Sequence, residues 1–215
     1  NFKTKLAGEI KNYDSSKYFD VKQAKRLDKV SQYAIIAARE AFKDSKITKE
    51  NTNLNNVGIF VGSGIGGIET IQKQCETNTL KGNSRVSPMF IPMGIVNMPA
   101  GNIAIDLGLK GESISIVTAC SSATHSIGEA YRAIKHGYEE VVLAGGSEAP
   151  ICEVGLAGFE NMKALSHSTD KNRASIPFDK ERSGFVMGEG AAVIVLEELE
   201  HAKKRGAHIY AEIIG

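Results

Sequence analysis

The sequence predicts an α/β fold: a mostly parallel central sheet with helices on both faces. Short β-branched apolar runs at residues 57–61, 114–117 and 141–145 have the pattern of buried strands. Segments with helical periodicity separate these runs. Strands that alternate with helices are typical of a parallel sheet whose neighbours are joined by helical crossovers.

The composition excludes several classes of protein. The 215 residues suffice for one sizeable domain, and 42% hydrophobic with 24% charged residues is ordinary for a globular protein. A net charge of +1 gives no reason to expect nucleic acid or a membrane as a partner. No apolar run is long enough to span a bilayer, and the first residues have no signal-peptide core. Three cysteines without a CxxC pair indicate reduced thiols in a cytoplasmic protein, and neither a disulfide framework nor a metal site.

The first half of the chain begins with a polar surface segment and then a helix over residues 29–44. The strand at 57–61 runs into GSGIGG at 62–67, which formally matches a dinucleotide-binding GxGxxG. The acidic residue that ribose recognition needs about twenty positions later is absent. We therefore favour glycines that allow a close approach of the backbone. Residues 68–81 continue as a helix or a loop.

Prolines and apolar residues at 84–99 predict a buried connection or an interface, followed by a short helix over 100–107 that ends at Gly108. Beyond the strand at 114–117, we expect a strand and turn at 140–148 and a polar loop over 166–180. A strand at 188–196, a charged helix at 197–205 and the start of one more strand at 208–214 complete the chain.

Cys120 lies where the strand at 114–117 passes into a helix that Gly137 closes. Free amide donors and the positive end of the helix dipole favour a thiolate at such a place. The small neighbours Ala119 and Ser121 would let a substrate approach. Local chemistry alone leaves two interpretations open, a nucleophile or an inert buried cysteine.

Lys22, Lys25 and Arg26 have i, i+3 and i+4 spacing, so in a helix they would share one face. A solvated charged face is the simpler interpretation of such a cluster.

Several segments resemble the β-ketoacyl-[acyl-carrier-protein] synthases, and most closely the type II condensing enzymes of fatty-acid synthesis. They are TACSSA at 118–123, GSGIGG at 62–67, IVNM at 95–98, GGSE at 145–148 and the long run at 177–191, in the family's order. The resemblance covers essentially the whole chain. It implies a thiolase-like fold, of which residues 1–215 would form the N-terminal synthase domain. The family's first strand and its entire second half are not in this sequence.

The resemblance also implies roles for individual residues. Cys120 would be the nucleophile that takes an acyl group from acyl carrier protein as a thioester, with its own N–H as an oxyanion donor. The residues expected to line the acyl pocket are Ile65, Phe90, Ile91 and Phe159. Of these, Phe90 and Ile91 are expected to reach the acyl pocket of the partner subunit in a homodimer. The residues expected to dock the acidic carrier protein are Lys22, Lys25, Arg26 and Lys163.

The implied reaction is a decarboxylative condensation. The acyl group moves to Cys120, malonyl-carrier protein then loses CO2, and the carbanion attacks the thioester to give a 3-oxoacyl product. No cofactor is implied, because the substrate is carried on the phosphopantetheine arm of the carrier protein. The family's two catalytic histidines lie in the missing half, and none of the five histidines here has their context. We therefore expect that residues 1–215 alone cannot elongate an acyl chain.

Three alternatives remain. The first is a non-catalytic module that binds acyl groups or carrier protein, although such a module has no need of Cys120. The second is a cysteine hydrolase, whose Gly-x-Cys-x-Gly turn is contradicted by Thr118 and Ser122. The third is a thiolase, which the run at 177–191 disfavours. A half-sheet without its first strand would also leave an open edge.

Overall fold

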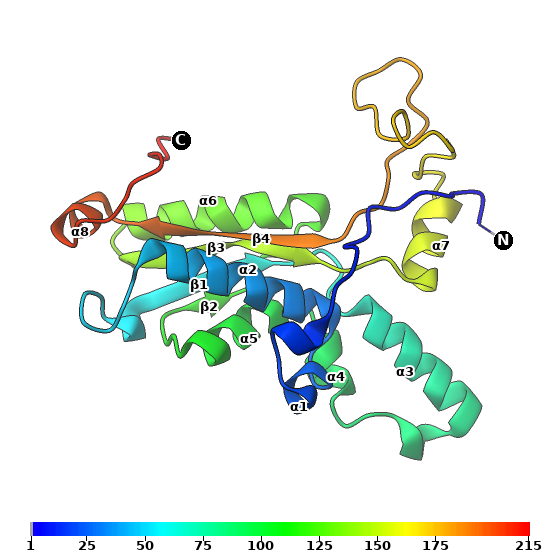
Figure 1. The fold of residues 1–215 in the computed structure, drawn as a ribbon, viewed down its shortest axis with the longest axis horizontal. Coiled ribbons are helices and arrows are strands. Elements are labelled where there is room, and N and C mark those ends of the chain that lie inside the picture. Colours follow the sequence, from blue (N-terminus) through cyan, green and yellow to red (C-terminus); the bar gives the residue numbers. More distant parts are fainter. Residues whose placement is uncertain (1) are drawn as a thin grey trace.

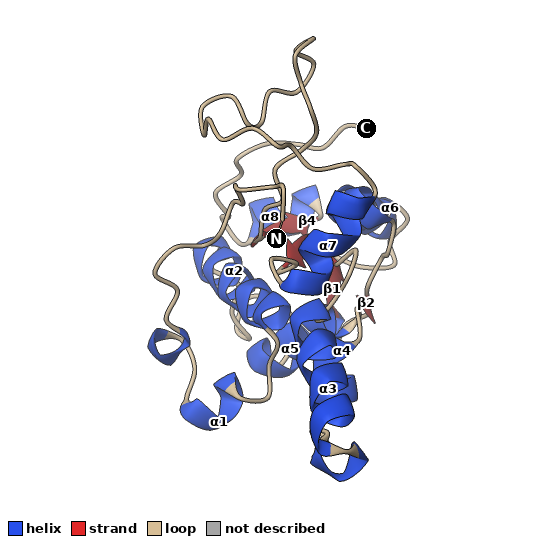
Figure 2. Ribbon diagram, turned by 90° about the vertical axis from the view of Figure 1, so that its right-hand side faces the viewer, coloured by secondary structure: helices blue, strands red, loops and turns tan. Residues whose placement is uncertain are grey.

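The computed structural model describes residues 2–215, which form a four-stranded sheet between layers of helices (Figures 1 and 2). The strands are β1 (Val57–Gly62), β2 (Ser113–Ile114), β3 (Val141–Glu148) and β4 (Gly190–Glu197). Their spatial order is β2-β1-β3-β4. The pairs β1–β2 and β1–β3 are parallel and only β4 runs antiparallel, so the predicted mostly parallel sheet is confirmed.

Eight α-helices are present within residues 2–215: α1 (Val21–Ala24), α2 (Lys29–Ser45), α3 (Ile68–Lys81), α4 (Phe90–Gly94), α5 (Met98–Leu107), α6 (Ser122–Lys135), α7 (Glu153–Asn161) and α8 (Leu199–Lys204). The helices predicted at 29–44 and 100–107 are confirmed, and residues 68–81 prove to be helical. Gly108 ends α5 in the left-handed conformation, as expected of a glycine cap. No helix in this part of the chain has the length and apolar character needed to cross a membrane.

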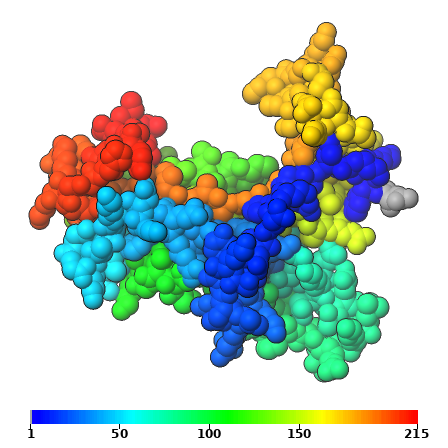
Figure 3. All heavy atoms as spheres, viewed as in Figure 1, coloured from blue at the N-terminus to red at the C-terminus, as the bar shows by residue number. Residues whose placement is uncertain are grey.

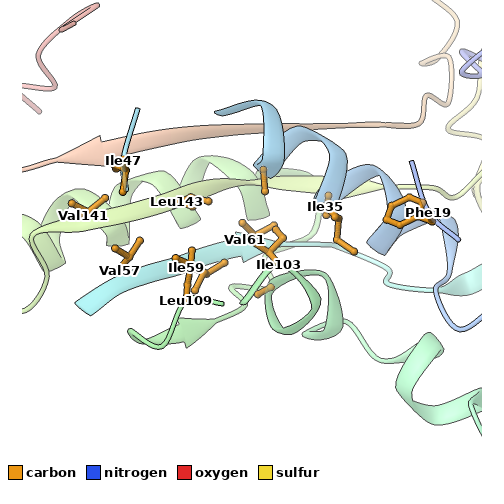
Figure 4. Packing of buried hydrophobic residues seen from close by; sticks show 13 residues of the cluster. Phe19, Ile35, Ile47, Val57, Ile59, Val61, Ile103, Leu109, Val141 and Leu143 are labelled. Carbon is orange, nitrogen blue, oxygen red and sulfur yellow. The ribbon is translucent and has the colours of Figure 1, made fainter. Parts of the chain in front are cut away.

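Helices cover both faces of the sheet, as predicted. On one face, α2 and α5 pack on a core to which β1 contributes Val57, Ile59 and Val61 (Figure 4). On the other face, Phe60 and neighbouring residues of β3 pack on α6. Because alternate side chains of a strand point to opposite faces, one strand supplies both cores.

One predicted strand differs from the structure in its position. Residues 114–117 were expected to form a buried strand, but β2 ends at Ile114 and lies at the edge of the sheet. It pairs on one side only, and Val117, three residues beyond its end, is 47% exposed. An edge strand can carry the same β-branched residues as a central one, and for this reason the pattern alone did not distinguish them.

The strand expected at 208–214 is also wrong. Residues 207–215 form no ladder with the sheet, and Tyr210 and Ile214 are largely exposed. By contrast, β3 is longer than predicted: it continues through Gly145 and Gly146 to Glu148, because β4 pairs with it over all eight residues. The loop between α7 and β4 projects from the body of the molecule (Figure 3).

Candidate active site at the carboxyl ends of the strands

Three segments that carry candidate functional residues meet at one edge of the sheet. Gly62 ends β1 and opens the glycine-rich turn, Glu148 ends the neighbouring β3, and Cys120 follows β2. Since these strands are parallel, their carboxyl ends lie on the same side. The Cys120 side chain is exposed, so the structure does not support the inert buried cysteine.

Cys120 sits in a short 3-10 turn, η4 (Ala119–Ser121), directly before α6. Ala119 has a left-handed φ of 53°, which is unfavourable for a residue with a Cβ. Ser122 stabilises this turn: its hydroxyl accepts a bond from the Thr118 N–H at 2.9 Å and donates to the Ala119 carbonyl at 2.7 Å. The thiol is therefore held at the start of a 14-residue helix whose first turn has no side-chain cap.

Glycines let the strand ends approach this turn closely. A Cβ on Gly62 would stand 2.5 Å from the Ile116 carbonyl oxygen, and one on Gly146 would stand 2.7 Å from the Ala123 Cβ. A Cβ on Gly64 would stand 3.1 Å from the Ala119 carbonyl oxygen. The predicted close approach of the backbone is thus confirmed. The glycines allow the ends of β1 and β3 to approach the Cys120 turn and the start of α6.

Glu148 anchors the glycine-rich turn. Its carboxylate accepts bonds from the Gly64 N–H and, at 3.3 Å, from the Ser63 hydroxyl. Burial raises the pKa of Glu148, although the bonds from Gly64, Ser63 and the Ile65 N–H oppose that rise. Neither Glu148 nor Ser122 was predicted as a site residue. The sequence feature that could have indicated Glu148 is an acidic residue that follows two glycines at the end of a predicted strand.

The predicted acyl-pocket residues lie on three elements, of which the glycine-rich turn and α4 are joined by a hydrogen bond. Ile65 is half-buried in the glycine-rich turn, and the Gly67 N–H donates to the Gly94 carbonyl of α4 at 3.1 Å. Phe90, which is half-buried, and Ile91, which is 59% exposed, belong to that helix. Phe159 on α7 packs edge-to-face on Phe185, with ring centroids 5.4 Å apart.

The four cations of the predicted docking patch do not gather in one place. Lys22 lies on α1 with Lys25 and Arg26 directly after it, and all three are exposed. None of the three forms an ion pair within residues 2–215. Lys163 is also exposed, but it follows α7, which lies apart from α1 in both ribbon views.

Residues 2–215 contain no group of three or more His, Cys, Asp or Glu side chains able to hold a metal ion. His125 is exposed on α6, the helix that follows Cys120.

The family assignment comes from comparison with known sequences. Residues 3–202 match the family model described as the N-terminal domain of β-ketoacyl synthase. The chain belongs to the β-ketoacyl synthase family. The resemblance expected from the sequence is confirmed, and residues 3–202 cover all the segments on which it was based.

Curated relatives of this β-ketoacyl synthase chain are about twice its length. It is 47% identical to 3-oxoacyl-[acyl-carrier-protein] synthase 2 of Staphylococcus aureus over 98% of this chain and 51% of that protein. The synthase 2 of Vibrio cholerae is 46% identical over 100% of this chain and 52% of its own length. The chain therefore spans about half the length of these relatives.

Solved structures agree on the fold of this β-ketoacyl synthase chain. A β-ketoacyl synthase from Burkholderia phymatum superimposes with a TM-score of 0.88 at 32% identity, covering 100% of this chain and 53% of that one. A type II polyketide ketosynthase, solved in complex with its acyl-carrier protein, gives a TM-score of 0.78 at 28% identity over 93% of this chain and 55% of that one. The fold is thiolase-like, as expected.

Proposed function

We propose that this chain is the N-terminal synthase domain of a 3-oxoacyl-[acyl-carrier-protein] synthase and that Cys120 is its nucleophile. The observation that carries the proposal is an exposed thiol, fixed by Ser122 at the start of α6, beside a glycine-rich turn. The relatives named 3-oxoacyl-[acyl-carrier-protein] synthase 2 support the assignment of the activity.

The thiol step is an acyl transfer. The Cys120 sulfur attacks the thioester carbonyl of the acyl-carrier protein and forms a new carbon–sulfur bond, while the phosphopantetheine thiol leaves with a proton. The N–H of Cys120 donates to the oxyanion that forms on the carbonyl oxygen. In the condensation, malonyl-carrier protein loses CO2, its carbanion attacks the Cys120 thioester, and the cysteine thiol is released. The groups that stabilise this second step belong to the other half of the enzyme.

The same proposal assigns the remaining residues. Ile65, Phe90, Ile91 and Phe159 line the acyl pocket, while Lys22, Lys25, Arg26 and Lys163 receive the carrier protein. The ketosynthase solved with its acyl-carrier protein supports that partner. The proposal includes a homodimer in the cytoplasm. The exposed apolar side chains of Ile91 on α4, of Ile95 directly after it and of Val117 after β2 support the dimer.

The test is the intact mass of the complete polypeptide before and after incubation with acyl-carrier protein. We expect one acyl adduct in the parent protein and in a Cys75→Ala control, since Cys75 is an exposed thiol on α3. We expect none in Cys120→Ala. An adduct that persists without Cys120 would instead favour the non-catalytic acyl-binding module.

A further inference from the structure

The basic segment, residues 20–28, needs support from the rest of the molecule. It contains Lys22, Lys25 and Arg26, and its only regular structure is the four-residue helix α1. A helix of one turn is not stable in isolation. The arrangement of its three cations therefore depends on the contacts that hold its backbone.

The two ends of the segment are fixed by carboxylates. Asp20 accepts bonds from the Lys22 and Gln23 N–H groups, both at 2.8 Å, and so caps α1. Asp28 is buried and accepts bonds from the Val30 N–H at 3.0 Å and the Thr70 hydroxyl at 2.6 Å. These contacts leave the residues around Lys25 and Arg26 to be held by other groups.

Gln32 on α2 holds this middle part. Its side-chain amide donates to the Ala24 carbonyl at 3.2 Å and to the Leu27 carbonyl at 2.9 Å, the two carbonyls that flank Lys25 and Arg26. Its Oε1 accepts the Tyr13 hydroxyl at 2.6 Å. Gln32 is only 6% exposed, and both the oxygen and the nitrogen of its side-chain amide are hydrogen-bonded, as buried polar groups usually are.

We propose that Gln32 is a positioning residue for the docking of acyl carrier protein. It does not touch the partner. It fixes the backbone on both sides of Lys25 and Arg26, so the cations are ordered before an acidic surface arrives. A segment ordered in advance loses less conformational entropy on binding, and this lowers the concentration of carrier protein that docking requires. This inference rests on the proposed function.

The experiment measures the rate of Cys120 acylation in the complete polypeptide against the concentration of acyl-carrier protein, and separately with acyl-coenzyme A, which has no protein surface. Gln32→Leu should raise the half-saturating concentration of acyl-carrier protein about tenfold. Its maximal rate and its rate with acyl-coenzyme A should stay at the parent values. Tyr13→Phe removes one bond to Gln32 and should give a smaller rise in the same direction.

Ser31→Ala is the matched control. Ser31 is the buried neighbour of Gln32 on α2, and its hydroxyl accepts a bond from the Asn102 side-chain amide at 3.2 Å. The alanine variant loses this bond, which does not involve the basic segment. It should leave the half-saturating concentration unchanged. Equal effects of Gln32→Leu and Ser31→Ala, or a fall in the acyl-coenzyme A rate with Gln32→Leu, would overturn the inference.

A charge reversal separates this inference from the proposed function. The triple change Lys22→Glu, Lys25→Glu and Arg26→Glu should raise the half-saturating concentration more than Gln32→Leu does. If the triple variant responds and Gln32→Leu does not, the positioning role alone is wrong. If the triple variant is unaffected, the basic segment is not the docking site and the inference falls with it. If neither donor acylates the parent protein, the proposed function itself is wrong.

Discussion

At the scale of single residues, the site depends on side chains that hold the Cys120 turn and perform no chemistry themselves. Ser122 bonds to the backbone on both sides of Ala119, whose left-handed conformation is unfavourable without such support. Ser126, one turn further along α6, is equally buried, but its hydroxyl has no hydrogen-bond partner among residues 2–215. The two serines form a matched pair for mutation.

Ser122→Ala should lower the free energy of unfolding by about 0.5–1.5 kcal/mol, because the Thr118 N–H loses its acceptor and the Ala119 carbonyl loses its donor. It should also slow the alkylation of Cys120 by iodoacetamide, since the turn loses its fixed geometry. Urea unfolding and the alkylation rate measure the two effects. Ser126→Ala removes a hydroxyl that has no bond, so it should change neither; an equal loss in both variants would contradict the role given to Ser122.

Glu148 predicts a dependence of stability on pH. Its raised pKa in the folded protein means that the folded state binds more protons than the unfolded state above the ordinary value of 4.5. The contribution of Glu148 to stability therefore falls as the pH rises from that value through its folded pKa. Glu148→Gln has no charge to bury, so its stability relative to the parent should improve between pH 4 and pH 8. Unfolding both proteins at each pH tests this, and a difference that stays constant with pH would contradict it.

At the scale of elements, α6 and the strand ends fit together because glycines stand where any side chain would collide. Gly62 lies against the Ile116 carbonyl and the Ser122 and Ser126 side chains. Gly128, in the exposed middle of α6, has no atom near the position of a Cβ. Packing therefore requires a glycine at position 62 but not at position 128.

Gly62→Ala should destabilise the protein by about 1–3 kcal/mol, because its Cβ would overlap backbone that cannot move independently. Gly128→Ala should stabilise it by about 0.5–1 kcal/mol, because alanine favours a helix interior. Thermal unfolding of the two variants is the measurement. The packing explanation would fail if both changes shifted the melting temperature in the same direction.

Periodicity predicted the elements whose pattern is local, and it failed where the outcome depends on neighbours distant in sequence. The helix at 29–44 and the strands at 57–61 and 141–145 have clear patterns and were located correctly. Residues 114–117 carry a strand pattern, but only the register with β1 decides how far that strand extends. In the site, the position of Cys120 could be predicted, whereas the anchoring by Glu148 could not, because Gly64 is 84 residues away from it along the chain.

At the scale of the whole molecule, both edges of the sheet are open in the part of the chain that the structure describes. β2 and β4 each pair on one side only. Large apolar side chains, among them Phe178 and Ile214, are almost fully exposed. Open edges and exposed apolar side chains favour association with other polypeptide segments.

A polypeptide restricted to residues 1–215 is therefore expected to self-associate at micromolar concentration and to form no 3-oxoacyl product from malonyl-carrier protein. Sedimentation velocity and a product assay by mass spectrometry check the two expectations, with the complete polypeptide as the control. A monomer with one cooperative unfolding transition would contradict the first, and malonyl-dependent product would contradict the second.

The strand order also implies a delay during synthesis between the appearance of a strand and that of its partner. β1 is interior to the sheet, yet its partner β3 leaves the ribosome roughly eighty residues later, which is on the order of ten seconds of translation. Through that interval the apolar run Val57–Gly62 has no ladder on its β3 side. Each nascent copy thus passes through a period in which chaperones, or a neighbouring ribosome's product, compete with the protein's own later residues for this strand.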